Sequence, residues 1–128
     1  MSDRDHALAL LEAAKRDLRA LKAMGNADIF ADEIAGFHAQ QATEKTLKAW
    51  LSAQHIAYPG THDLNVLLQL FEDTGASVTA FGSLVRLNAF AVNYRYEALG
   101  AGAVLEDRDS LTAEVAALVE HVSELLEV

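Results

Sequence analysis

The chain has 128 residues, 52% of them hydrophobic, which suffices for a single domain over residues 1–128 that needs no disulfide or structural metal. The absence of cysteine excludes disulfides, thiolate nucleophiles and zinc fingers. Ten Lys and Arg against nineteen Asp and Glu give a formal net charge of -9. This charge argues against general binding of a nucleic-acid backbone, which works through basic patches.

Neither a membrane-spanning segment nor a secretory signal is recognisable in the sequence. No stretch of about 18 uninterrupted apolar residues is present. The start of the chain, Met1 to Asp5, lacks the basic region and apolar run of a signal peptide. We therefore expect a cytoplasmic protein without membrane association.

The first helix is predicted over residues 3–24, because apolar residues recur there at helical spacing. Gly25 and Asn26 tolerate the left-handed conformation that ends a helix. A second, longer helix is predicted over residues 28–55, with Asn26 or Asp28 as its N-cap. The stripe that we expect the first helix to bury is Leu8, Leu11, Ala14, Leu18 and Leu21.

The second half of the chain predicts three more helices. Thr61, after the only proline, is placed to cap a third helix over residues 62–73. Ser77 can cap a fourth up to about residue 95, and a loop over residues 97–104 leads to a last helix that begins at Asp109 or Ser110. The expected buried positions are Leu64, Leu67, Leu68 and Phe71 in the third helix, Val78, Phe81, Leu84, Val85, Leu87, Ala91 and Val92 in the fourth, and Leu111, Val115, Leu118, Val119, Val122 and Leu125 in the last.

These elements predict an all-α fold. No segment alternates polar and apolar residues as a half-buried strand does. Short connections make consecutive helices antiparallel neighbours. The economical arrangement is an up-and-down four-helix bundle with an additional fifth helix.

A polar stripe on the second predicted helix is the most informative local feature. Its residues step by three or four and so share one face, which suits either an amphipathic boundary with a Glu44–Lys48 ion pair or the wall of a polar cleft or oligomer interface. The stripe consists of Phe30, Ile34, Phe37, Gln41, Glu44, Lys48, Leu51 and His55.

Other polar residues also admit two interpretations. Asn88 lies between apolar neighbours and needs hydrogen-bond partners if it is buried. Arg95, flanked by Tyr94 and Tyr96, suits an anion or a stacked base, and equally a partner subunit. His62-Asp63 could form a polarised imidazole or a pair of metal ligands, but helix capping also explains the Asp.

Sequence signatures of the common cofactor sites are missing. The chain has no H-E-x-x-H or Glu-x-x-His spacing, no G-x-G-x-x-G, no P-loop and no G-x-S-x-G. We expect no metal and no cofactor.

Four segments taken together resemble the prokaryotic HEPN domain family. They are FHAQQATEKTLK at 37–48, YPGTHDL at 58–64, LN at 87–88 and VNYRY at 92–96. Their order and spacing match, and the resemblance covers roughly residues 4–126. It implies a helical bundle, commonly a homodimer, with a nucleotide-binding role. It also implies a minimal nucleotidyltransferase as partner, in a toxin–antitoxin pair or as the protein that binds the substrate for that enzyme.

Some HEPN branches are metal-independent endoribonucleases that use an Arg, an adjacent polar residue and a His four to six positions later. Neither Arg95 nor Arg86 is followed by such a His in this sequence. RNA cleavage through the 2′-hydroxyl requires an acid–base group, so this departure argues against ribonuclease activity unless His62 substitutes.

The hypothesis favoured by the sequence is a non-enzymatic HEPN-type domain that binds a nucleotide or a nucleotidyltransferase partner. The alternatives are a ribonuclease toxin in which Arg95 and His62 meet on RNA, or an interaction module with an acidic docking surface. Lys45 is included among the ligand-binding residues because of the resemblance, since it lies off the polar stripe. The expected ligand-binding residues are Gln41, Lys45, Lys48, His62, Asp63, Asn88, Arg95 and Tyr96.

Overall fold

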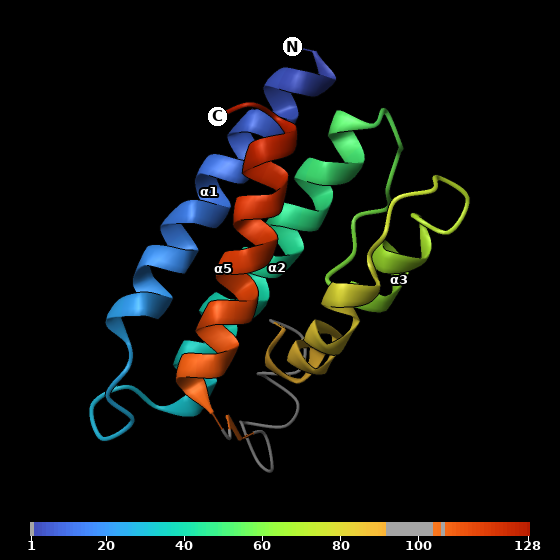
Figure 1. Cartoon of the computed structure of the whole chain (residues 1–128). Helices are drawn as coiled ribbons and strands as arrows, with labels where there is room; N and C mark the ends of the chain where they lie inside the picture. The colour runs from blue at the N-terminus through green and yellow to red at the C-terminus, as the bar shows by residue number, and fades with distance from the viewer. Residues whose placement is uncertain (1, 92–103, 106) are drawn as a thin grey trace.

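The computed structural model describes residues 2–91, 104–105 and 107–128, and this part of the chain is helical without a strand. Five helices follow one another within these ranges, with the N-terminus beside the end of the last helix (Figure 1). They are α1 (Asp3–Ala23), α2 (Asp32–Ala53), α3 (Leu64–Gln69), η1 (Thr79–Phe90) and α5 (Arg108–Leu125). The all-α fold and its five helices are as predicted.

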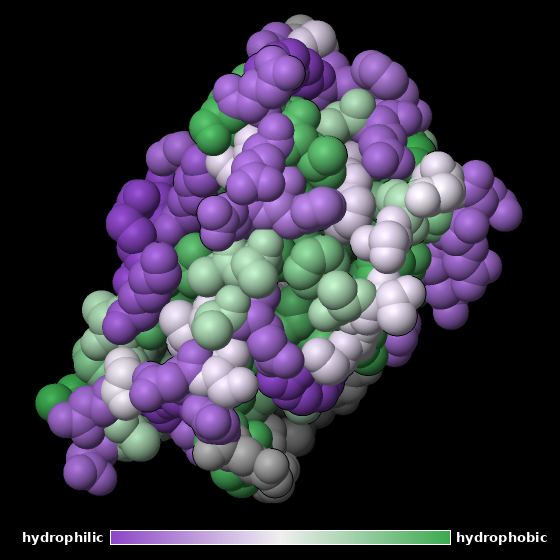
Figure 2. Space-filling view, viewed as in Figure 1, coloured by the Kyte–Doolittle hydropathy of each residue, from purple (hydrophilic) through white to green (hydrophobic). Residues whose placement is uncertain are grey.

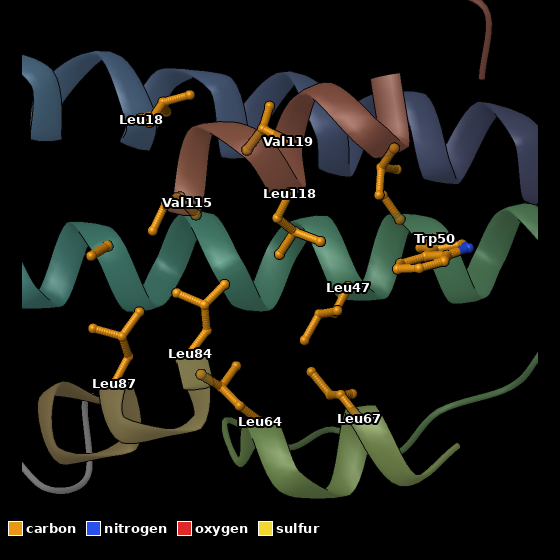
Figure 3. Close-up of a cluster of buried hydrophobic side chains, with 14 of the residues drawn as sticks. Leu18, Leu47, Trp50, Leu64, Leu67, Leu84, Leu87, Val115, Leu118 and Val119 are labelled. Atoms are coloured by element: carbon orange, nitrogen blue, oxygen red, sulfur yellow. The ribbon is translucent and has the colours of Figure 1, made fainter. Parts of the chain in front are cut away.

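Helix α2 is the central element, because it packs against all four other helices. Helices α1 and α5 cover one side of it, and α3 and η1 cover the other (Figure 3). Being enclosed, α2 buries small and polar side chains as well as large apolar ones. The hydroxyl groups of Thr43 and Thr46 each donate to a carbonyl four residues earlier in α2, which satisfies them inside the core.

The start of α2 differs from the prediction. Residues 26–30 form a turn, in which the Asn26 side chain accepts from the Asp28 amide and the Asn26 carbonyl accepts from Phe30. Short polar side chains compete in this way with a helix. The helix therefore begins at Asp32 after Ala31, which gives no side-chain cap, and neither Asn26 nor Asp28 is the N-cap.

The predicted limits of α3 and α5 also need correction. Helix α3 is capped by Asp63 instead of Thr61, whose hydroxyl accepts from the Asp63 amide. Helix α5 is capped by Asp107, which accepts from the Ser110 amide. At the end of α5 the predicted buried residue Leu125 is 52% exposed, and its neighbour Leu126 is buried instead.

The fourth helix, η1, is a 3-10 helix and not the predicted α-helix. A 3-10 helix has three residues per turn, so residues three apart lie on one edge. Five large apolar residues, from Val78 just before η1 to Phe90, keep that spacing and belong to or pack against the core, and Figure 3 shows Leu84 and Leu87 pointing toward α2. They are Val78, Phe81, Leu84, Leu87 and Phe90. The predicted continuation of this helix to residue 95 and most of the loop after it lie outside the described residues.

Candidate functional site

Glu44 is the centre of a polar cluster between α2, the segment before α3, and η1. Its side chain is 5% exposed and accepts three hydrogen bonds. One carboxylate oxygen, Oε1, lies 3.0 Å from Gln40 Nε2 and 2.9 Å from His62 Nδ1. The other, Oε2, lies 3.0 Å from Lys48 Nζ. The expected Glu44–Lys48 ion pair is therefore confirmed, as one part of a larger network.

Two opposing effects act on the pKa of Glu44. Burial raises the pKa, because it penalises the charged form. Hydrogen bonds from Gln40, His62 and Lys48, together with the Lys48 charge, lower it, and the pKa falls below its ordinary value of 4.5. Glu44 is thus a carboxylate at neutral pH and acts only as an acceptor.

The bond to Glu44 determines which nitrogen of His62 faces solvent. An ionised carboxylate can only accept, so the proton lies on Nδ1, and a neutral ring leaves Nε2 as an acceptor. The His62 side chain is 44% exposed. A carboxylate that orients an imidazole through Nδ1 is also the arrangement that prepares a histidine for acid–base chemistry.

Asp63 and Asn88 fix the start of α3 to η1 through hydrogen bonds. Asp63 Oδ1 accepts from the Asn65 amide and from Asn88 Nδ2, each at 2.9 Å. Asn88 Oδ1 in turn accepts from the Leu64 amide at 2.9 Å. The capping interpretation of Asp63 is therefore confirmed, and the partners that Asn88 needs are found at the start of α3.

Lys48 connects the cluster to the loop that follows α2. Its ammonium lies 5.6 Å from the centre of the Tyr58 ring, within the range of a cation–π contact. The Tyr58 hydroxyl is 2.7 Å from His6 Nε2 on α1. Neither Gln40 nor Tyr58 is among the ligand-binding residues expected from the sequence. Only the position of Gln40, one turn before Glu44, could have indicated a hydrogen bond between Gln40 and Glu44.

A comparison with known families identifies the family of this chain. The HEPN domain model matches residues 7–128, nearly the whole chain. The chain belongs to the HEPN domain family. No curated protein and no solved structure matches it.

The HEPN domain brings together most, but not all, of the expected ligand-binding residues. Lys48 and His62 bind Glu44, and Gln41 joins them through its bond to the Gln40 side chain at 2.8 Å. Asp63 and Asn88 bind each other in an adjoining group next to His62. We call this set, with Gln40 and Glu44, the Glu44 cluster.

The remaining expected residues are not part of the Glu44 cluster as the structure describes it. Lys45 lies on the side of α2 that faces α1, where its ammonium is 2.7 Å from Asp17. His38 binds the same Asp17 carboxylate at 3.0 Å. Arg95 and Tyr96 lie outside the described residues, a few positions beyond the end of η1.

Two further properties of the HEPN domain concern only the residues that the structure describes. Among them, no three His, Asp or Glu side chains gather in a way that could hold a metal ion. Within the same ranges, no helix is long and apolar enough to cross a membrane.

We expect Glu44→Gln to destabilise the HEPN domain at pH 7 by about 2 kcal/mol, because the buried bonds to Lys48 and His62 lose their charged acceptor. A carboxyl group with a lowered folded-state pKa stabilises the fold above its unfolded pKa, and this stability is lost as the pH falls through the folded value. The difference between wild type and Glu44→Gln should therefore shrink below pH 4.5. Urea denaturation at several pH values measures it.

Glu72→Gln is the matched control, since Glu72 is exposed and its side chain makes no hydrogen bond or ion pair with a described residue. It should leave the free energy of unfolding unchanged at pH 7. A Glu44→Gln variant that is as stable as wild type at pH 7 would contradict the role of Glu44 as the centre of the cluster.

Proposed function

We propose that this HEPN domain binds a nucleotide through the Glu44 cluster, as one half of a two-component system with a nucleotidyltransferase. The proposal rests on one observation: five of the expected ligand-binding residues lie in two adjoining hydrogen-bonded groups, one around Glu44 and one between Asp63 and Asn88, which the chain joins at His62-Asp63. Such a network holds donors and acceptors in fixed positions, which lowers the entropic cost of ordering them around a ligand.

The charges of the Glu44 cluster indicate which part of a nucleotide it would bind. Lys48 is neutralised by Glu44, and Asp63 adds a further negative charge nearby. The cluster therefore offers hydrogen bonds to a base or ribose instead of excess positive charge to a phosphate. Phosphate binding falls to Arg95, which makes its guanidinium the decisive group for affinity.

Titration with ATP, followed by NMR, tests this proposal. We expect millimolar ATP to shift the imidazole signals of His62 but not those of His38, which binds Asp17 on the α1 side of α2. His62→Ala and Arg95→Ala should weaken binding about tenfold or more, equivalent to one charge-assisted hydrogen bond.

Lys45→Ala serves as the matched control for that titration, because Lys45 is an α2 lysine held by Asp17. Its affinity for ATP should equal that of wild type. If ATP perturbs neither His62 nor its neighbours, the nucleotide-binding proposal fails.

The partner is tested separately, by purifying the tagged protein from its native cell and identifying copurifying proteins by mass spectrometry. Recovery of a small nucleotidyltransferase supports the two-component system. Recovery of the HEPN domain alone counts against it, and leaves the nucleotide titration as an independent test.

A second candidate function is that of a metal-independent endoribonuclease toxin. The Glu44–His62 pair favours it, because Glu44 orients an exposed imidazole that can act as an acid or base on the 2′-hydroxyl of RNA. Expression should then arrest growth, and both His62→Ala and Arg95→Ala should relieve the arrest. Harmless overexpression of the wild type would rule this function out.

A further inference from the structure

The hydrogen bonds of the Glu44 cluster fix the orientation of the Gln40 amide. Its Nε2 donates to Glu44 Oε1 at 3.0 Å and to the His62 carbonyl at 3.2 Å, so both of its N–H groups are used. The reversed amide would place Gln40 Oε1 against these two acceptors and leave a fully buried side chain without either bond. Gln40 Oε1 is therefore an acceptor, and the group that donates to it at 2.8 Å is Nε2 of Gln41.

The orientation of Gln41 follows from that of Gln40. One N–H of Gln41 is used by Gln40, so Gln41 Oε1 and the second N–H have no partner among the described residues. His62 adds another acceptor, because Glu44 holds the proton on Nδ1 and leaves Nε2 free to accept. Gln41 is half-buried and His62 is 44% exposed, so both reach solvent. Around Gln40 a ligand therefore meets two acceptors, His62 Nε2 and Gln41 Oε1, and one amide donor.

The nearby cations do not change this pattern of acceptors. The Lys48 ammonium is held between Glu44 Oε2 and the Tyr58 ring, and the Lys48 side chain is only 13% exposed. Other cations line a groove between α1 and α5, on the side of α2 that Figure 2 shows, and they are Lys15, Arg19 and Lys22. Recognition by the Glu44 cluster thus depends on the hydrogen bonds that a ligand donates and accepts.

We propose that the Glu44 cluster selects a nucleobase that carries an exocyclic amino group over one that carries carbonyl groups alone. This inference rests on the proposed binding of a nucleotide and adds the class of base. An amino group brings two N–H donors, one for His62 Nε2 and one for Gln41 Oε1. In adenine, guanine and cytosine the ring nitrogen beside the amino group is an acceptor, which matches the free N–H of Gln41.

His62 is the residue that makes the site selective. An amide alone pairs with either kind of base edge, because it has one donor and one acceptor. Hypoxanthine, which has a carbonyl and an N–H where adenine has its amino group and ring nitrogen, can pair with Gln41 in the reverse order. It brings no second hydrogen for His62 Nε2. Its binding would displace water from Nε2 without replacing the hydrogen bond, which lowers affinity.

Titration of wild type with ATP, GTP and ITP tests the inference. ITP has the same ribose and phosphates but carries hypoxanthine, and it differs from GTP only by the missing amino group. We expect the dissociation constants for ATP and GTP, measured from the His62 imidazole signals, to be about tenfold or more below that for ITP, equivalent to one hydrogen bond. Equal affinity for ITP and either amino-bearing nucleotide would overturn the inference and leave nucleotide binding intact.

His62→Ala separates selection from affinity. Followed through the side-chain amide signals of Gln41, this variant should bind ATP about tenfold more weakly and ITP almost as wild type does, because ITP makes no bond to Nε2. Lys45→Ala, whose lysine is held by Asp17, is the matched control and should keep the wild-type preference. Circular dichroism checks that both variants fold, and the titration of wild type needs no variant.

The possible failures of the two proposals look different. A folded His62→Ala that still prefers ATP over ITP would overturn the assignment of selection to His62. Equal responses of wild type to ATP and ITP would overturn the inference alone. If no nucleotide shifts the signals of His62 or Gln41, nucleotide binding itself fails, and the inference fails with it.

Discussion

Replacement of Arg108 by alanine is expected to lower the free energy of unfolding by about 3 kcal/mol, because it leaves a carboxylate and two carbonyls without their donor. The Arg108 side chain is 7% exposed at the start of α5. Its guanidinium lies 2.6 Å from Asp32 Oδ1, 2.7 Å from the Met24 carbonyl and 2.9 Å from the Phe30 carbonyl. One side chain thus joins the end of α1, the turn after it, and the start of α2.

Two variants separate this role from loss of charge alone. Arg108→Lys keeps the charge, but one ammonium group cannot reproduce the planar fork, so the loss should be intermediate. Arg86→Ala removes an exposed arginine that pairs with Glu114, and should cost less than about 1 kcal/mol. Urea denaturation of the three variants measures this order. Equal losses for Arg108→Ala and Arg86→Ala would contradict the role that we assign to Arg108.

The Arg108 site shows why some contacts could not be predicted from the sequence. Arg108 and Asp32 are 76 positions apart, and no local pattern connects them. Helical spacing predicted α1 almost to its ends, because a long amphipathic helix is determined by its own residues. The contact between the starts of α2 and α5 depends on how these two helices pack with α1.

The Glu44 cluster was predicted in part, for the same physical reason. The shared face of Gln41, Glu44 and Lys48 follows from spacing along one helix. That Glu44 is buried and bonded to His62, 18 positions later, depends on the course of the loop between them. Spacing alone cannot reveal a partner across such a loop, so the only partner that the sequence predicts for Glu44 by name is Lys48.

In η1 the spacing of the apolar residues fits a 3-10 helix better than the α-helix that we predict for this segment. Apolar residues at a strict spacing of three, from Val78 to Phe90, fit three residues per turn better than 3.6. An α-helix over the same segment would place Leu84 and Asn88 on one face. In the 3-10 helix Leu84 and Leu87 are buried together, and Asn88 turns toward Asp63.

Gly36 in α2 is expected to tolerate no side chain, because it lies against Phe90 at the end of η1. A Cβ at position 36 would lie 2.3 Å from Cδ1 and 2.5 Å from Cγ of the Phe90 ring. Phe90 is only 4% exposed, so displacing its ring disturbs the core around it. Gly36→Ala gains about 1 kcal/mol of helix propensity, but overpacking costs about 1 to 3 kcal/mol. Gly36→Leu adds further volume at the same point, so the net loss should grow to about 3 kcal/mol or more.

A double-mutant cycle identifies Phe90 as the cause. Phe90→Ala alone should cost about 3 kcal/mol through the cavity that it leaves, but Gly36→Ala made in that background should become neutral or stabilising. Gly82→Ala is the control, since a Cβ there meets nothing within 4 Å. Additive losses from Gly36→Ala and Phe90→Ala would contradict direct contact.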